Sequence, residues 1–188
     1  MIRSFEDKAI PKVILDRILK NAFKGPSAGF SQGYEILVLT EKEDKIKFYE
    51  MWGNIQERSE SNKKWMKMEN AGVVLIVCSH KQAYLDRYAA PDKGWTDKDE
   101  ARWPVPFWHI DAGMASLLAL LTVVDEELGA VFTGVFDKDY ARDKFSIPEQ
   151  YTPMGAILIG YPASFDEPSP SLKRGHRDLS DVVHYNSW

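Results

Sequence analysis

The chain has 188 residues, with 24 Lys plus Arg, 28 Asp plus Glu and a single Cys, and its formal net charge is −4. Its 44% hydrophobic and 28% charged residues are ordinary for a soluble globule and exclude disordered and collagen-like classes. The acidic balance argues against a general nucleic-acid binder. The lone Cys78 excludes an internal disulfide and a Cys-rich zinc site, so we expect a cytoplasmic protein without a bound metal.

The first part of the chain predicts helices alternating with short strands. Apolar residues recur at helical spacing over 11–24, where a Pro suits the first turn and a Gly-Pro pair ends the helix. Residues 34–40 are rich in β-formers and predict a strand, whereas the charged segment 41–57 predicts a surface helix. The continuous apolar run 72–79 is typical of a strand buried on both faces, and 81–88 predicts a short helix.

The second part is dominated by one long apolar helix, predicted over 107–128. It is hydrophobic on nearly every face, which predicts burial from several sides, a second subunit among them. Its apolar run of about 15 residues is shorter than the roughly 20 that span a bilayer, so we expect no membrane segment. The longest irregular stretch, 89–106, precedes it and has the length of functional loops. The remaining predictions are a short strand or turn at 130–135, a helix at 138–145 and a buried strand at 154–161.

One loop offers a motif of uncertain meaning. Residues 25–29 match G-x-S-x-G, the nucleophile elbow of hydrolases with Ser27 as nucleophile, but that elbow needs a strand before the Ser and a helix after it. Here a helix leads in and a strand follows, so a serine hydrolase is a minor alternative. The other interpretations are a helix-stopping turn, or a loop whose small residues let an anion or a heterocycle approach the backbone.

Basic residues gather near the C-terminus. Residues 173–177 hold the densest cluster, which is typical of a solvated tail but large enough to bind one phosphate. Apolar side chains follow it, and we expect this tail to pack on another surface; they are Val182, Val183, Tyr185 and Trp188.

Other polar residues give little sign of self-sufficient catalysis. The four His residues lie too far apart for metal-ligand spacing, and Cys78 reads as an inert core residue. Asp111, near the start of the long helix, is predicted to serve a helix-terminus or capping role. This inventory favours an enzyme whose chemistry comes from a bound cofactor.

Four segments together resemble the FMN-dependent nitroreductase family. The resemblance covers nearly the whole chain, and the order and spacing of the motifs carry it more than any single motif does. The segments are Ile2-Arg3-Ser4-Phe5 followed by Pro11, the loop 25–32, the helix from Asp111 through Leu128-Gly129-Ala130, and Ile147-Pro148 with 155–162 and the ending 174–188.

The resemblance implies one α+β domain over 1–188, a sandwich with an antiparallel-dominated central sheet wrapped by helices. It further implies a homodimer with a long central interface helix, and a tail over 165–188 that wraps the partner subunit. The implied activity passes hydride from NADH or NADPH through flavin N5 to an electron-poor, nitroaromatic- or quinone-like small molecule. The alternative is a family member that binds or processes flavin without nitroreductase turnover.

The resemblance also implies which residues bind FMN, with no catalytic side chain of the protein's own. The phosphate would be held by Arg3, Arg174 and Arg177. The flavin and ribityl chain would lie along Pro26, Ser27, Ala28 and Gly29, with Gln32 as a further contact. The isoalloxazine would pass near Phe132, Thr133 and Gly134. The loop 89–106 would shape the substrate side. The chain departs from the family pattern at Phe30, Gly33 and Asp178.

Overall fold

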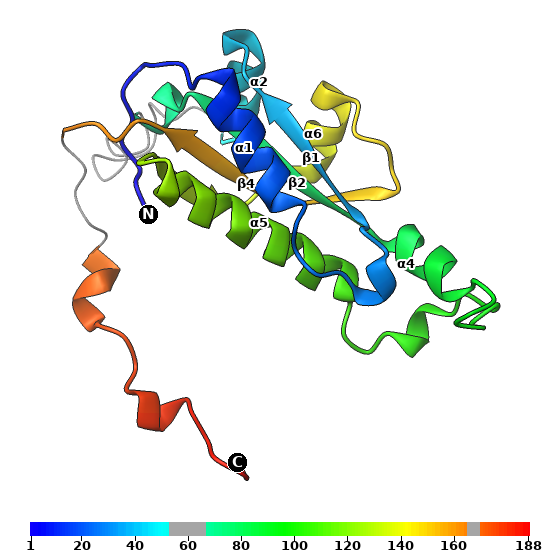
Figure 1. The fold of residues 1–188 in the computed structure, drawn as a ribbon. Helices are drawn as coiled ribbons and strands as arrows, with labels where there is room; N and C mark the ends of the chain where they lie inside the picture. Colours follow the sequence, from blue (N-terminus) through cyan, green and yellow to red (C-terminus); the bar gives the residue numbers. More distant parts are fainter. Residues whose placement is uncertain (53–66, 165–169) are drawn as a thin grey trace.

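A four-stranded antiparallel sheet forms the centre of the protein. The computed structural model describes residues 1–52, 67–164 and 170–188, and within them the strand order is β1-β2-β4-β3. All three neighbouring pairs run antiparallel, which confirms the predicted α+β class (Figure 1). The strands are β1 (Tyr34–Leu39), β2 (Val73–His80), β4 (Tyr151–Gly160) and β3 (Gly129–Thr133).

The two inner strands are buried because their side chains are apolar on both faces. The first seven residues of β2 are buried, and so are the last six of β4. Such strands need cover above and below. Their continuous apolar runs predicted this position, although β4 begins three residues earlier than the predicted 154–161.

Helices supply that cover in two layers (Figure 1). On one face, α1 (Lys12–Ala22) and α5 (Phe107–Asp125) pack together over the sheet, with Ile18 and Ala115 fully buried between them and the strands. On the other face, α2 (Lys42–Glu50) and α6 (Lys138–Phe145) enclose a second apolar cluster. The remaining elements are α4 (Lys81–Tyr88) and the short 3₁₀ helices η1 (Ala28–Phe30), η4 (Lys67–Asn70), η5 (Glu100–Arg102), η6 (Pro170–Arg174) and η7 (Leu179–Asp181).

The long helix α5 is buried on one side only. Small side chains at Ala112, Ala115 and Ala119 let it approach the sheet closely and are fully buried. By length and composition alone it could cross a membrane, but this packing makes it part of the protein core. It ends at Asp125, three residues before the predicted end, and Glu127 then adopts a left-handed φ of +56°. Its outer face carries an exposed apolar stripe, which consists of Met114, Leu117, Leu121 and Val124.

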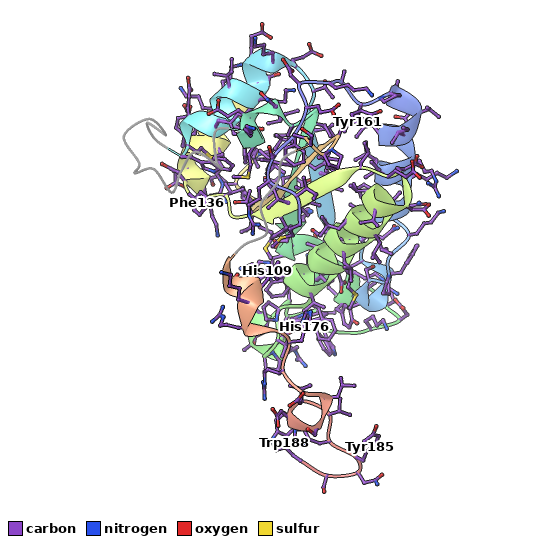
Figure 2. The ribbon with its side chains drawn as sticks, turned by 90° about the vertical axis from the view of Figure 1, so that its left-hand side faces the viewer. His109, Phe136, Tyr161, His176, Tyr185 and Trp188 are labelled. Carbon is purple, nitrogen blue, oxygen red and sulfur yellow. The ribbon has the colours of Figure 1, made fainter. Side chains whose placement is uncertain are left out.

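The C-terminal tail extends away from this body. Residues 171–188 are all exposed, and Figure 2 shows Tyr185 and Trp188 at the far end of the tail, apart from Phe136 and Tyr161 on the body. The tail therefore does not pack on its own chain. Helix α2 ends at Glu50, before the predicted end of the helix 41–57, and residues 53–57 of that prediction lie outside the described part, as do residues 165–169 of the predicted tail.

We expect Val74→Ala to lower the free energy of unfolding by about 2 kcal/mol, because the removed methyl groups are fully buried in β2. The same change at Val13, which is 75% exposed on α1, should shift it by less than about 0.5 kcal/mol. Urea unfolding measures both. Equal effects for the two variants would contradict the assignment of β2 to the core.

Candidate functional site

The loop after α1 is tightly built from its own hydrogen bonds. Gly29 adopts a left-handed φ of +61° within η1, and the Ser31 backbone N–H and hydroxyl both donate to the Ala28 carbonyl. The Gln32 N–H donates to Ser27 Oγ at 2.9 Å. Since Ser27 Oγ accepts this bond, its own hydroxyl hydrogen stays available to donate to a ligand. The loop has one fixed shape, as a binding loop requires.

The buried carboxylate of Asp111, on α5, holds this loop by a hydrogen bond. Asp111 is only 3% exposed, and its Oδ2 accepts hydrogen bonds from Ala28 N at 2.8 Å and from the Tyr84 hydroxyl at 2.6 Å. Asp111 is the fifth residue of α5, so the predicted terminus or capping role is wrong. Its function is tertiary, because it joins α5 to the 26–32 loop and to α4.

Helix α4 holds the same loop from its outer side. Arg87 Nε donates to the Gly29 carbonyl at 2.8 Å. A Cβ at Gly29 would lie 2.7 Å from the Tyr88 ring, and one at Gly33 would lie 2.3 Å from the Tyr84 ring. Glycine at these positions is therefore required by close contact with α4. This contact gives a physical reason for Gly33, one of the departures from the family pattern.

A second group of predicted residues lies along β3. The Ile2 N–H donates to the Ala130 carbonyl at 2.9 Å, which brings Arg3 to the start of the strand. Ala130 thus turns its backbone polar groups to the outer edge, and by strand alternation so does Phe132. Phe132 and Gly134 are exposed at the other end of β3. The outer edge of β3 therefore has the cation Arg3 near its first residues and the outward backbone groups of Phe132 near its last ones.

The two groups lie at opposite edges of the sheet. The 26–32 loop leads into β1, and three strand spacings separate β1 from β3 in the order β1-β2-β4-β3. That separation is about 14 Å. Arg174 and Arg177 lie in the exposed tail, where their guanidinium groups bond the Ser171 and Asp181 carbonyls. Within one chain the predicted cofactor residues therefore lie in three groups, at the two edges of the sheet and in the tail.

The loop 89–106 forms an ordered aromatic lobe beside the 26–32 loop. Tyr88, Trp95 and Trp103 contact one another with ring centroids 4.6 to 5.7 Å apart, and Trp103 also contacts Tyr84 and Trp108. Surface ion pairs add to the order of this segment; they are Arg87–Asp92, Lys98–Asp86 and Lys81–Glu100. Through Tyr88 the lobe touches Gly29, so it flanks the loop predicted to bind flavin.

The other polar candidates have structural surroundings. Burial raises the pKa of Cys78 to about 11, so the thiolate is scarce at neutral pH. His109 Nδ1 lies 3.0 Å from Ser79 Oγ, its Nε2 accepts from Trp108 Nε1, and burial followed by the charge of Lys138 lowers its pKa. Within the described residues, no three His, Cys, Asp or Glu side chains are placed to hold a metal ion. Ser27 follows α1 and precedes β1, the reverse of a nucleophile elbow.

Comparison with known proteins now fixes the family. A sequence model described as "Nitroreductase family" matches residues 1–161. The chain belongs to the nitroreductase family. A Methanothermobacter thermautotrophicus protein whose name is that of an NADH dehydrogenase/NAD(P)H nitroreductase is 30% identical, over the whole of this chain and 82% of that protein. Membership supports an oxidoreductase of the flavin type in general terms.

Solved structures agree on the fold. A nitroreductase family protein from Clostridium difficile 630 superposes with a TM-score of 0.70 at 22% identity, covering all of this chain and 93% of that one. An FMN-dependent nitroreductase from C. difficile R20291 gives 0.66 at 22% identity, covering all of this chain and 94% of that one. These likenesses confirm the nitroreductase-like sandwich.

The sequence did not indicate the residues that hold the 26–32 loop in place, namely Tyr84, Arg87 and Asp111. One signal was present, because an ionisable residue in an otherwise apolar helix must find a partner when buried. Its partner, the Ala28 N–H, is 83 residues away in the chain and belongs to the backbone, which no side-chain pattern reveals.

We expect Gly29→Ala to destabilise the protein more than Gly94→Ala does. Both glycines have positive φ, +61° and +75°, so both changes carry a backbone cost of about 1 kcal/mol. Only the Cβ at position 29 meets a neighbour, the Tyr88 ring; nothing lies within 4 Å of the other. Urea unfolding of the two variants measures the difference, and equal costs would contradict the tight packing of Gly29 on α4.

Proposed function

We propose that this nitroreductase is an FMN-dependent oxidoreductase of the cytoplasm. When bound, FMN supplies the redox chemistry, since its N5 takes hydride from NADH or NADPH and delivers it to an electron-poor acceptor of the nitroaromatic or quinone type. The single observation that carries the proposal is the open edge of β3, with Arg3 at its start and exposed Phe132 and Gly134 at its end.

This edge fits the shape and charge of FMN. From Ala130 to Gly134 the strand rises about 14 Å, so a phosphate near Arg3 and a ring system near Gly134 can belong to one elongated molecule. Arg3 would hold the phosphate by charge-assisted hydrogen bonds. The outward N–H group of Phe132 would face the polar edge of the flavin, where such a donor would stabilise the negative charge that reduction creates.

The loop at the other edge of the sheet would complete the site from a second copy. Within one chain the 26–32 loop precedes β1, so it lies at the edge of the sheet opposite β3, and an interface between two chains would bring the loop of one to the β3 edge of the other. We therefore propose a homodimer with two composite sites. Pro26, Ser27, Ala28, Gly29 and Gln32 of one protomer would face Arg3 and β3 of its partner.

The exposed stripe on α5 supports this assembly. Met114, Leu117, Leu121 and Val124 are 39 to 72% exposed and recur every three or four residues on one side of the helix. Such spacing is typical of helices that pack together. The tail, with Arg174 and Arg177 and its exposed Val182, Val183, Tyr185 and Trp188, would gain burial by crossing onto the partner.

The aromatic lobe over 89–106 would form the substrate side. It flanks the 26–32 loop through Tyr88, and its rings offer apolar surface that suits a flat aromatic acceptor. Closing such a wall over the flavin would exclude water from the transferred hydride.

The purified protein should bind FMN stoichiometrically and show a flavin absorption spectrum. Anaerobic addition of NADH or NADPH should bleach that spectrum, and an electron-poor acceptor should restore it. Failure to bind FMN after reconstitution would overturn the proposal. Bound flavin that neither nicotinamide reduces would favour the alternative of a flavin-binding or flavin-processing member without turnover.

The variant Leu117→Glu/Leu121→Glu should convert the dimer into a monomer, because it places two charges in the apolar stripe. It should also weaken FMN binding by about tenfold or more, although neither residue belongs to the flavin motif. The control Val13→Glu, at a side chain of α1 that is 75% exposed, should change neither property. Light scattering and flavin fluorescence measure them, and a dimeric double variant would contradict the α5 interface.

A further inference from the structure

Most of the backbone polar groups of residues 27–29 in the 26–32 loop already have hydrogen-bond partners within the protein. The Ala28 carbonyl accepts from Ser31, and the Ser27 carbonyl accepts from the Phe30 N–H. The Gly29 carbonyl accepts from Arg87, and the Ala28 N–H is bound to Asp111. The sequence suggested a backbone-rich cradle, but these groups face the protein rather than a ligand. What the loop offers a flavin is the fixed stretch of small residues Ser27, Ala28 and Gly29, with the Ser27 hydroxyl as a donor.

The shape of that surface depends on one carboxylate. Ala28 N and the Tyr84 hydroxyl converge on the same atom, Asp111 Oδ2, at 2.8 and 2.6 Å. The Ala28 N–H can only donate, and the Tyr84 hydroxyl, whose ring is fully buried, donates to the same oxygen. Asp111 is the point at which α5, α4 and the loop are joined.

Two buried tyrosine hydroxyls, those of Tyr84 and Tyr34, interact with the Asp111 carboxylate. Burial, followed by the hydrogen bond to Asp111, raises the pKa of Tyr84, so its hydroxyl keeps the proton that it donates. The Tyr34 hydroxyl is also buried, and it has no hydrogen-bond partner in the part of the chain that the structure describes. Burial and then the charge of Asp111 raise the pKa of Tyr34 as well. In such a setting an unpaired donor is costly.

We propose that Asp111 is the positioning residue of the flavin-binding loop, acting through the Ala28 N–H and supported by Tyr84. Asp111 does not touch the cofactor. It sets the backbone position of Ala28 and Gly29 before the flavin arrives, so that binding spends little free energy on ordering the loop. Arg87 restrains the same turn from the opposite side through the Gly29 carbonyl. This inference rests on the proposed function, because it assigns the loop to flavin.

Three variants of the full-length protein separate hydrogen bonding from charge and from volume. Asp111→Asn keeps one acceptor oxygen, and one oxygen is sufficient because both donors use Oδ2. Asp111→Leu keeps a similar volume but offers no acceptor. Tyr84→Phe removes only the second donor and leaves the bond to Ala28, so it stays informative should the Leu variant fail to fold. Asp16→Leu, at an exposed ion pair on α1, is the matched control.

Two measurements report on the loop, and one of them needs no flavin. In the FMN-free protein, Ala28 amide hydrogen exchange should accelerate about tenfold or more in Asp111→Leu and a few-fold in Tyr84→Phe. The dissociation constant for FMN, from flavin fluorescence, should rise in the same order, about tenfold or more for the Leu variant. Asp111→Asn and Asp16→Leu should stay within about threefold of wild type in both measurements.

The outcomes distinguish this inference from the proposed function. If wild type fails to bind FMN, the proposed function fails, whatever the exchange data show. If wild type binds FMN and the Leu and Phe variants bind it equally well, the positioning role of Asp111 is overturned. It is also overturned if Asp111→Asn is as impaired as Asp111→Leu, because charge rather than the shared acceptor would then be decisive.

Discussion

The rest of the structure depends on the pairing of β2 with β4 at the centre of the sheet. Both strands are apolar on both faces, so both faces of the sheet must be covered. The pair α1 and α5 covers one face, and α2 and α6 cover the other. The outer positions are left to β1 and β3, and this arrangement places the candidate site residues outside the tail, since one group lies just before β1 and the other along β3.

Placing β1 and β3 at opposite edges explains why one chain keeps two groups of candidate site residues apart. The 26–32 loop precedes β1 and the other group lies along β3, so β2 and β4 lie between the strands that carry them. The apolar stripe of α5 and the exposed tail are the surfaces left uncovered by the same arrangement. The second copy proposed above would cover these surfaces and bring the two groups of candidate residues together.

Asp111 shows how a buried residue of a core helix can hold a loop that is distant in the sequence. An otherwise apolar helix with one buried carboxylate bears a desolvation cost, and the bonds from Ala28 and Tyr84 offset it. The arrangement stabilises a loop conformation that the loop's sequence alone does not impose. The glycines at 29 and 33 fit the same scheme, because the Tyr88 and Tyr84 rings occupy the space that a side chain would need.

The sequence by itself determined the fold class, nearly all helices and strands, the family and the loops that carry its motifs. These follow from local patterns, such as the continuous apolar runs of β2 and β4, which can be recognised in the sequence without the three-dimensional structure. Only the tertiary structure decided that Arg3 and Gly29 lie at different edges, that the tail leaves its own body, and that Asp111 anchors a loop rather than caps a helix. Each depends on contacts between residues far apart in the chain. The Ala28 partner of Asp111 is a backbone N–H common to almost every residue, so its identity appears only when the chain has folded.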